Sequence, residues 1–368
     1  MEKRSILFLV QLPPPVHGAA LRNEFLAKSI LLHNSFDIKV MRLDFAKSVK
    51  DVGAFSILKL MKMIGFSVRL FFKLLAKKPN LIYYNFAMRG IALYRDWFFV
   101  RIAKLFGVPL VLHLRTQGVK EQVAKSSLKL KLFKSALSST TIVCLSEYLA
   151  TDIETVYQEQ PEIVANGIDM VVTDEAIHNK KENSVPVFLF LSNLTRSKGI
   201  FEFIDALKIL HDKGLECRGK VTGPEYDVKI SYLEQYIIDS GLEGIVEITG
   251  PVYGDDKFQK FLDSDVFVFP TWFEAFPGVV LEAMQSGLPV ISTMEGAIPE
   301  IVDNGNTGFL VVQKDVESLA EKMEILAKDR GLRDKLGAAG RIKFKELYTS
   351  ATFEQEMKKV FESALIAR

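Results

Sequence analysis

The chain has few of the features that mark secreted or nucleic-acid-binding proteins. Its 368 residues contain only two cysteines, Cys144 and Cys217, which lie far apart in strand-like contexts. We expect both to be small core hydrophobes rather than a disulfide or a metal site, which fits a reducing, cytoplasmic compartment. The net charge of +2 is too small to indicate nucleic acid, and no nucleic-acid-binding motif accompanies it.

Long apolar runs are also missing. The apolar run near the N-terminus, Ile6 to Val10, is followed by Pro13-Pro14-Pro15 and is too short for the core of a signal peptide. No later stretch reaches the roughly 18 uncharged apolar residues that a spanning helix needs. We therefore expect a protein that is not integral to the membrane.

What the sequence does contain is an alternation of short apolar runs with helix-length segments, typical of parallel sheets covered on both faces. An apolar share of 48% and a length of 368 residues fit two globular domains. The strands are predicted at Ile6–Val10, Ile38–Leu43, Leu81–Asn85, Leu110–Leu114, Thr141–Leu145, Glu162–Val164, Val187–Leu191, Arg218–Val221, Val246–Ile248, Val266–Phe269, Val290–Ser292 and Gly308–Val311.

The alternation is interrupted once. Residues 169–185 are polar and charged without a period, as in an interdomain linker. We therefore predict one domain over residues 1–168 and a second over residues 186–349. Residues 350–368 form a final helix that follows another helix rather than a strand.

The most informative segment begins at the buried strand Val266–Phe269. A loop carrying Glu274 follows it, and then a helix carrying Glu282, with seven residues between the two glutamates. The carboxyl ends of strands are where open α/β sheets bind ligands. The unpaired N–H groups of a helix N-terminus there suit the oxygens of a phosphate or a sugar.

This segment resembles the E-x7-E signature of the retaining GT-B glycosyltransferases of family 4, and the resemblance is best from Val187 to Leu310. It implies two doubly wound, Rossmann-like domains facing a deep cleft, with a C-terminal helix crossing back to the first domain. It also implies transfer of a sugar from a UDP- or GDP-linked donor, with no protein nucleophile. The retaining glycoside hydrolases, in contrast, need two catalytic carboxylates.

The resemblance assigns roles on the donor side of the site. Glu282 would accept hydrogen bonds from the ribose hydroxyls, and Glu274 would lie near the donor sugar. The main-chain amides of the intervening segment would contact that sugar or the phosphate; its residues are Ala275, Phe276, Pro277 and Gly278.

Two cations are expected at the end of the strand Val187–Leu191. Lys198 and Arg196 could neutralise the departing diphosphate, although two solvated loop cations would look the same in sequence. The arginine that the family carries five residues before this lysine is replaced by Asn193 here. Arg196 is therefore a substitute candidate.

Three further turns are expected near the donor. Gly223 and Val252 follow two strands whose loops flank the nucleotide in the family, although glycine also serves packing in such turns. Gly18 stands where the family has a glycine-rich phosphate loop, with His17 before it as an acceptor-side candidate.

Another strand end, in the first half, carries His113 and Arg115. Their spacing of two residues puts both side chains on one face of the strand. The resemblance makes His113 a catalytic candidate and Arg115 an acceptor-side candidate. The alternative is a core histidine satisfied by the backbone.

The region 47–95 has ten lysines and arginines against a single acid, Asp51. Apolar, basic helices of this kind lie on anionic membrane surfaces, which fits an enzyme that acts on a lipid-linked acceptor at the inner membrane face. An ordinary sheet-covering helix with its lysines in water is the alternative.

The function expected from the resemblance is sugar transfer to a growing glycan or lipid-linked acceptor in surface polysaccharide, lipopolysaccharide or glycolipid synthesis, without cofactor or metal. A nucleotide-sugar epimerase would need acid and base groups that we cannot place, and a phosphorylase would be far longer. A non-catalytic nucleotide-sugar-binding protein is supported only by the departures at Gly18 and Asn193. A transfer assay with a defined acceptor separates these classes.

Overall fold

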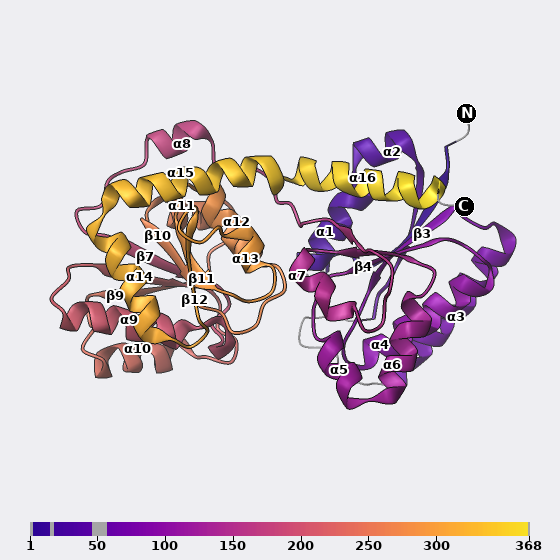
Figure 1. Ribbon diagram of the computed structural model, residues 1–368, viewed down its shortest axis with the longest axis horizontal. Helices are drawn as coiled ribbons and strands as arrows, with labels where there is room; N and C mark the ends of the chain where they lie inside the picture. The colour runs from indigo at the N-terminus through magenta and orange to yellow at the C-terminus, as the bar shows by residue number, and fades with distance from the viewer. Residues whose placement is uncertain (1–2, 15–17, 46–56, 367–368) are drawn as a thin grey trace. The chain divides into compact units, whose positions relative to one another are not determined.

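The computed structural model describes residues 3–14, 18–45 and 57–366, which form two α/β units (Figure 1). One unit comprises residues 1–166 and 351–368, and the other comprises residues 167–350. Each contains one six-stranded sheet in which all paired strands are parallel. The predicted class, two doubly wound domains, is confirmed.

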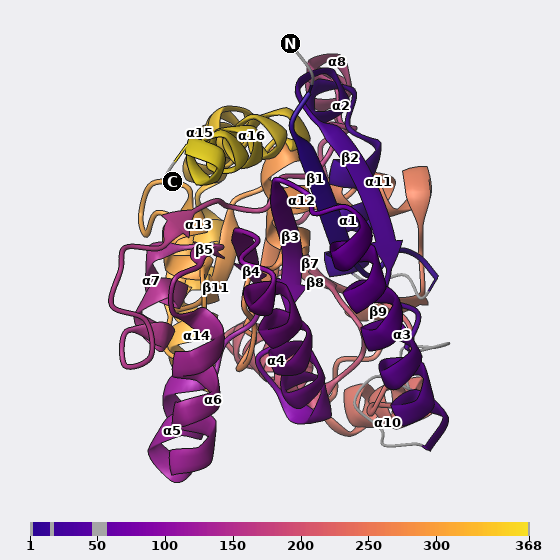
Figure 2. The same ribbon diagram turned by 90° about the vertical axis from the view of Figure 1, so that its right-hand side faces the viewer.

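The sheet of the first unit has the order β2-β1-β3-β4-β5-β6, so β2 is an edge strand (Figure 2). The strand order reverses between β1 and β3, the kind of position where such sheets bind ligands. The strands are β1 (Ser5–Val10), β2 (Asp37–Arg42), β3 (Leu81–Phe86), β4 (Leu110–Leu114), β5 (Thr141–Cys144) and β6 (Glu162–Ile163).

Alternate residues of these strands feed two cores, one on each face of the sheet. Leu7 and Tyr84 pack on the face that α3, α4 and α6 cover, while Phe8 and Tyr83 pack on the face that carries α16. The helices of this unit are α1 (Gly18–Lys28), α2 (Ile30–Ser35), α3 (Ile57–Ala76), α4 (Gly90–Leu105), α5 (Val119–Lys125), α6 (Ser127–Leu137), α7 (Glu147–Ala150) and α16 (Ser350–Ile366).

The final helix thus belongs to the first unit, as predicted. The Phe361 ring of α16 packs against Phe8 of β1 and Tyr83 of β3, with ring centroids 5.8 and 5.4 Å apart. Arg4 donates a hydrogen bond to the Leu365 carbonyl, 2.7 Å away. The return of the C-terminus onto the first sheet is confirmed.

The sheet of the second unit has the order β12-β11-β10-β7-β8-β9, and its order reverses between β7 and β10. Its strands are β7 (Val187–Leu191), β8 (Arg218–Thr222), β9 (Val246–Gly250), β10 (Val266–Phe269), β11 (Val290–Thr293) and β12 (Gly308–Val311). Its helices are α8 (Asp174–His178), α9 (Ile200–Asp212), α10 (Ile230–Asp239), α11 (Gly254–Leu262), α12 (Gly278–Gln285), α13 (Ile298–Ile301), α14 (Val316–Lys328) and α15 (Arg330–Leu347).

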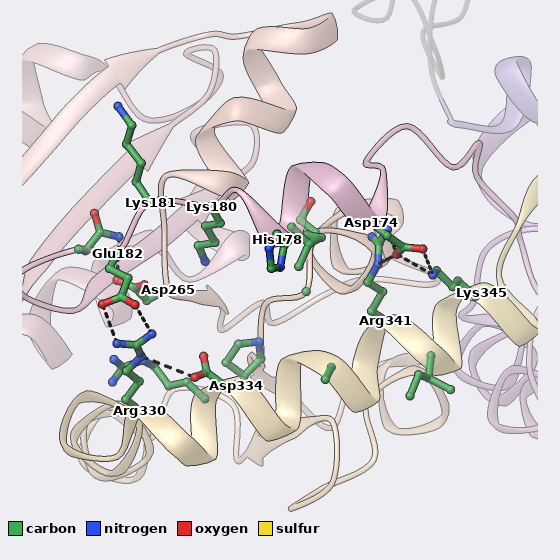
Figure 3. A pocket seen from close by; sticks show the side chains of 18 residues that line it. Asp174, His178, Lys180, Lys181, Glu182, Asp265, Arg330, Asp334, Arg341 and Lys345 are labelled. Carbon is green, nitrogen blue, oxygen red and sulfur yellow. Dashed lines mark hydrogen bonds and ion pairs between the residues drawn. The ribbon is translucent and has the colours of Figure 1, made fainter.

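Residues 169–185, predicted as a linker, belong to this second unit. The Val171 N–H donates to Gln285 Oε1, 2.9 Å away, and Asp174 of α8 pairs with Arg341 of α15 at 2.8 Å (Figure 3). Glu182 pairs with Arg330 at 2.6 Å, also on α15. The segment looks like a linker because its polar residues are used for ion pairs rather than for a periodic apolar face.

Two simpler expectations concern the cysteines and the membrane. Cys144 and Cys217 are free thiols, and burial raises the pKa of Cys144 to about 12 and that of Cys217 to about 11. Both are core side chains, as predicted. In the described ranges, no helix combines the length and the apolarity needed to cross a bilayer.

Candidate functional site

Two loops of the second unit meet where its strand order reverses. One follows β7 and contains Lys198, and the other follows β10 and contains Glu274. Because β7 and β10 are neighbouring parallel strands, their carboxyl ends carry both loops at the same edge of the sheet.

Backbone contacts hold these loops together. The Trp272 N–H donates to the Ser197 carbonyl at 2.8 Å, and the Thr271 hydroxyl donates to the same oxygen at 3.1 Å. Gly199 lies between the loop and α9 with φ of 79°, and a Cβ there would lie 2.1 Å from the Pro270 carbonyl oxygen. Only glycine fits both this conformation and this close approach.

The Lys198 ammonium donates to Glu274 Oε2 at 2.7 Å and to the Phe273 carbonyl at 3.2 Å. The side chains of this pair are 20% and 23% exposed, so a ligand can reach both. Two residues that were predicted separately, 76 positions apart, thus form one charged pair in the crevice.

Residues after β11 and β12 support the Glu274 loop, and sequence reasoning missed them. The Ala297 N–H donates to the Ala275 carbonyl at 2.8 Å. The Gln313 side chain donates to the Trp272 carbonyl at 3.1 Å and to Glu295 Oε2 at 2.6 Å. These residues follow predicted strands, which is the one feature of the sequence that could have indicated them. They have no characteristic spacing from Glu274.

Glu282 lies on α12, and its carboxylate faces a partner that sequence reasoning also missed. Lys257 of α11 places its Nζ 2.5 Å from Glu282 Oε2, and the two side chains are 25% and 18% exposed. The sequence could not indicate this pair, because β10 and a loop separate α11 from α12 and no fixed spacing links residues on the two helices.

The N-terminus of α12 is available for hydrogen bonding. The helix begins at Gly278 after Pro277, and no side chain of the described ranges caps it. The first N–H groups of a helix have no intrahelical acceptor, so those of Gly278 and Val279 can bind ligand oxygens. Phe276 and Pro277 are buried beneath this turn.

The other donor-side candidates occupy different positions. The Arg196 guanidinium lies over the Phe201 ring, 4.6 Å from its centroid, rather than against Lys198 or Glu274. Gly223 has φ of 152°, and a Cβ there would lie 1.7 Å from the Ser192 carbonyl oxygen, so packing alone requires this glycine. Val252 is half-buried in the loop after β9.

In the first unit, His113 is completely buried on β4. Its Nδ1 lies 3.0 Å from the Tyr83 hydroxyl and 3.4 Å from Arg115 Nη2. Arg115 has only donors, so we infer that Nδ1 is the acceptor and that Nε2 carries the proton. Burial, together with the Arg115 charge, lowers the pKa of His113 well below its ordinary value. The predicted common face of His113 and Arg115 is present.

The remaining first-unit candidates can be placed in part. Arg115 Nη1 donates to Asn166 Oδ1 at 2.6 Å. Gly18 is the first residue of α1, after β1. His17 lies outside the described residues. The acceptor-side and phosphate roles of these residues stay predictions.

Solved structures share this architecture over the whole chain. A sucrose-phosphate synthase from Thermosynechococcus elongatus has a TM-score of 0.75 at 17% sequence identity, covering 99% of this chain and all of that one. HepE of Anabaena, solved in complex with UDP, has a TM-score of 0.75 at 21% identity, covering 98% of this chain and all of that one. The fold is therefore the GT-B fold, with two Rossmann-like domains.

Sequence comparison gives a family match for part of the chain. Residues 172–343, which lie in the second unit, match the family described as Glycosyl transferases group 1. Over 192 residues it is 31% identical to the capsular polysaccharide biosynthesis glycosyltransferase CapM of Staphylococcus aureus, covering 52% of this chain and 50% of CapM. It is 32% identical to the sulfoquinovosyl transferase SQD2 of Arabidopsis thaliana, covering 46% of this chain and 34% of SQD2. The match thus spans half or less of these relatives.

Proposed function

We propose that this protein is a retaining glycosyltransferase that moves a sugar from a nucleotide-sugar donor to a glycan or lipid-linked acceptor. The observation that carries the proposal is the accessible Lys198–Glu274 pair, 2.7 Å apart, at the strand-order reversal of the second sheet. The family match supports it. A structural relative at 19% identity, HepE, was solved in complex with UDP-glucose.

On binding, the Glu282 carboxylate would accept hydrogen bonds from the two ribose hydroxyls. Its present partner is the Lys257 ammonium, so the hydroxyls would share or replace an ion pair rather than meet an isolated charge. The N-terminal amides of α12 would hydrogen-bond the diphosphate or the sugar.

During transfer, Lys198 would stabilise the negative charge that develops on the departing diphosphate. Glu274 keeps the ammonium in place before the donor binds, through the contact at 2.7 Å. No protein nucleophile is proposed, because the departing phosphate can accept the proton of the attacking hydroxyl. The protein positions the reactants and stabilises the leaving group.

We place the acceptor in surface polysaccharide, lipopolysaccharide or glycolipid synthesis, at the cytoplasmic face of a membrane. CapM and a colanic acid glycosyltransferase, WcaL of Salmonella typhimurium, carry such pathways in their names. We also propose that no metal is needed, since Lys198 supplies positive charge where the diphosphate would lie.

Calorimetry with a panel of nucleotides and nucleotide sugars tests the donor site. One nucleotide sugar should bind selectively to the wild type, and Glu282→Ala should weaken it by roughly tenfold to a hundredfold, the value of a charge-assisted hydrogen bond. Glu234→Ala, an exposed acid on α10, is the matched control and should leave the affinity unchanged. Unchanged donor affinity in Glu282→Ala would refute the ribose assignment.

A transfer assay with the identified donor separates an enzyme from a binding protein. Lys198→Ala should lower kcat by roughly a hundredfold to a thousandfold, as for removal of a group that stabilises developing negative charge. Its donor affinity should change much less than that of Glu282→Ala. A protein that binds the donor but transfers nothing to any lipid-linked or glycan acceptor would be a binding protein.

A further inference from the structure

Helix α3 of the first unit exposes an apolar stripe that faces solvent. The stripe consists of Ile57, Met61, Ile64, Val68, Phe72 and Leu75, whose exposed fractions range from 49% to 72%. The spacings of three and four residues place all six on one face of the helix. Such a contiguous apolar surface on a soluble domain marks an interaction site.

The stripe is not the core-facing side of α3. Phe66, Leu70 and Leu74 form that side and are completely or nearly completely buried. The centroid of the Phe66 ring lies 4.7 Å from the centroid of the Phe99 ring of α4. The helix is therefore anchored to the unit by one face while another remains uncovered.

A third side of α3 is basic. Lys62, Arg69 and Lys73 are seven and four residues apart, beside edge strand β2. Lys62 and Arg69 line a hollow of about 620 Å³ together with Arg42 of β2. At the C-terminal end of α3, a smaller hollow of about 170 Å³ is lined by four lysines: Lys39, Lys73, Lys77 and Lys78.

Acids offset little of this charge. Helix α3 contains no aspartate or glutamate. The two acids of the neighbouring strand region, Asp37 and Asp44, are already paired with Lys39 at 3.4 Å and Arg42 at 2.5 Å. The basic flank, defined as Lys39, Arg42, Lys62, Arg69, Lys73, Lys77 and Lys78, therefore has a formal charge of +7 against these two acids.

We propose that the apolar stripe and the basic flank of α3 dock the first unit on an anionic lipid surface. The stripe would enter the boundary between headgroups and acyl chains, while the flank would contact lipid phosphates. Docking α3 against a second copy of itself would bring two acid-free, lysine-rich helices together, and their repulsion opposes that arrangement. This inference goes beyond the donor site and uses none of its residues.

Cosedimentation of the full chain with vesicles tests it, without donor or acceptor. Vesicles that contain phosphatidylglycerol should retain the protein, and pure phosphatidylcholine vesicles should retain far less. The variant Ile64→Ser/Val68→Ser/Phe72→Ser should lower partitioning roughly a hundredfold by removing apolar area. The variant Lys73→Gln/Lys77→Gln/Lys78→Gln should lower it roughly a hundredfold on anionic vesicles alone.

Matched controls come from the second unit. Ile238→Ser/Ile342→Ser removes apolar side chains that are 50% and 58% exposed. Lys208→Gln/Lys229→Gln/Lys335→Gln removes three lysines, and both controls should bind as the wild type does. The proposal is overturned if the wild type does not bind anionic vesicles, or if the α3 variants bind these vesicles as strongly as the wild type does. A dimer that the serine variant abolishes, without vesicle binding, would instead assign the stripe to a second copy. Because no transfer is measured, this result is independent of the donor assignment.

Discussion

His113 shows how a single titratable side chain can be tied to the stability of its unit. Its imidazole is completely buried, and burial together with Arg115 lowers its pKa well below the ordinary value. The folded protein therefore holds it neutral over a pH range in which the unfolded chain binds a proton. Stability contributed by this group is present above about pH 6.5, the ordinary histidine pKa, and is lost as the pH falls below it.

We expect His113→Asn to reduce this pH dependence. Between pH 7.5 and pH 5.5 the first unit of the wild type should lose about 1.4 kcal/mol more unfolding free energy than the variant does, because one proton is taken up on unfolding. Urea unfolding at the two pH values measures the difference. His33→Asn, an exposed histidine of the same unit, should keep the wild-type dependence. Equal pH dependence in His113→Asn and wild type would contradict the neutral, buried assignment.

Sequence could place the site residues at the correct strand ends but could not predict their partners. Lys198 and Glu274 were both expected after strands, and strand order alone then brings them to one edge of the sheet. The contact between Lys257 and Glu282 depends on how α11 and α12 pack. The position of the Arg196 guanidinium over the Phe201 ring depends on the rotamer of the Arg196 side chain. Neither leaves a periodic signal in the sequence.

At the scale of elements, α16 stabilises the first unit although it lies at the other end of the chain. The Phe361 ring packs against Phe8, Phe36 and Tyr83, which come from β1, the turn before β2, and β3. A helix that contacts several strands at once contributes more than its local propensity, because its stability comes mainly from tertiary packing.

Phe361→Ala should therefore destabilise the first unit by about 3–5 kcal/mol, the usual loss for a buried phenylalanine. The chain has two tryptophans, Trp97 and Trp272, which lie in different units. In a Trp272→Phe background, fluorescence follows the first unit alone during urea unfolding. Lys359→Ala, exposed on the same helix, should change the midpoint little. An unshifted midpoint in Phe361→Ala would show that α16 adds nothing to this unit.

The elements themselves were well predicted, because parallel strands that are buried on both faces leave short apolar runs. All twelve predicted strands are present, and Leu110–Leu114, Val187–Leu191, Val266–Phe269 and Gly308–Val311 have the predicted bounds. The segment 169–185, which we expected to be a linker, contains α8. It contacts α15 through ion pairs and α12 through hydrogen bonds to Gln285, and such contacts have no sequence period.

At the scale of the whole molecule, the sequence pattern alone could not predict the strand order of either sheet. The first sheet reverses between β1 and β3, and the second reverses between β7 and β10. The sequence pattern predicts which segments are strands, but the order of the strands in each sheet depends on which helices cover which face of that sheet. The family resemblance implied two doubly wound domains, and the GT-B fold confirms that class.

The proposed transfer reaction should not depend on divalent cations. We expect transfer to continue in the presence of EDTA at a rate within about twofold of the untreated protein, because we propose that Lys198 supplies the positive charge that a metal supplies elsewhere. Initial rates with and without chelator, followed by added Mg²⁺, measure this. Lys198→Ala provides the comparison, since loss of the protein's own cation should slow transfer without EDTA. A large loss of wild-type activity on chelation that Mg²⁺ restores would show that a metal, and not the lysine alone, stabilises the departing diphosphate.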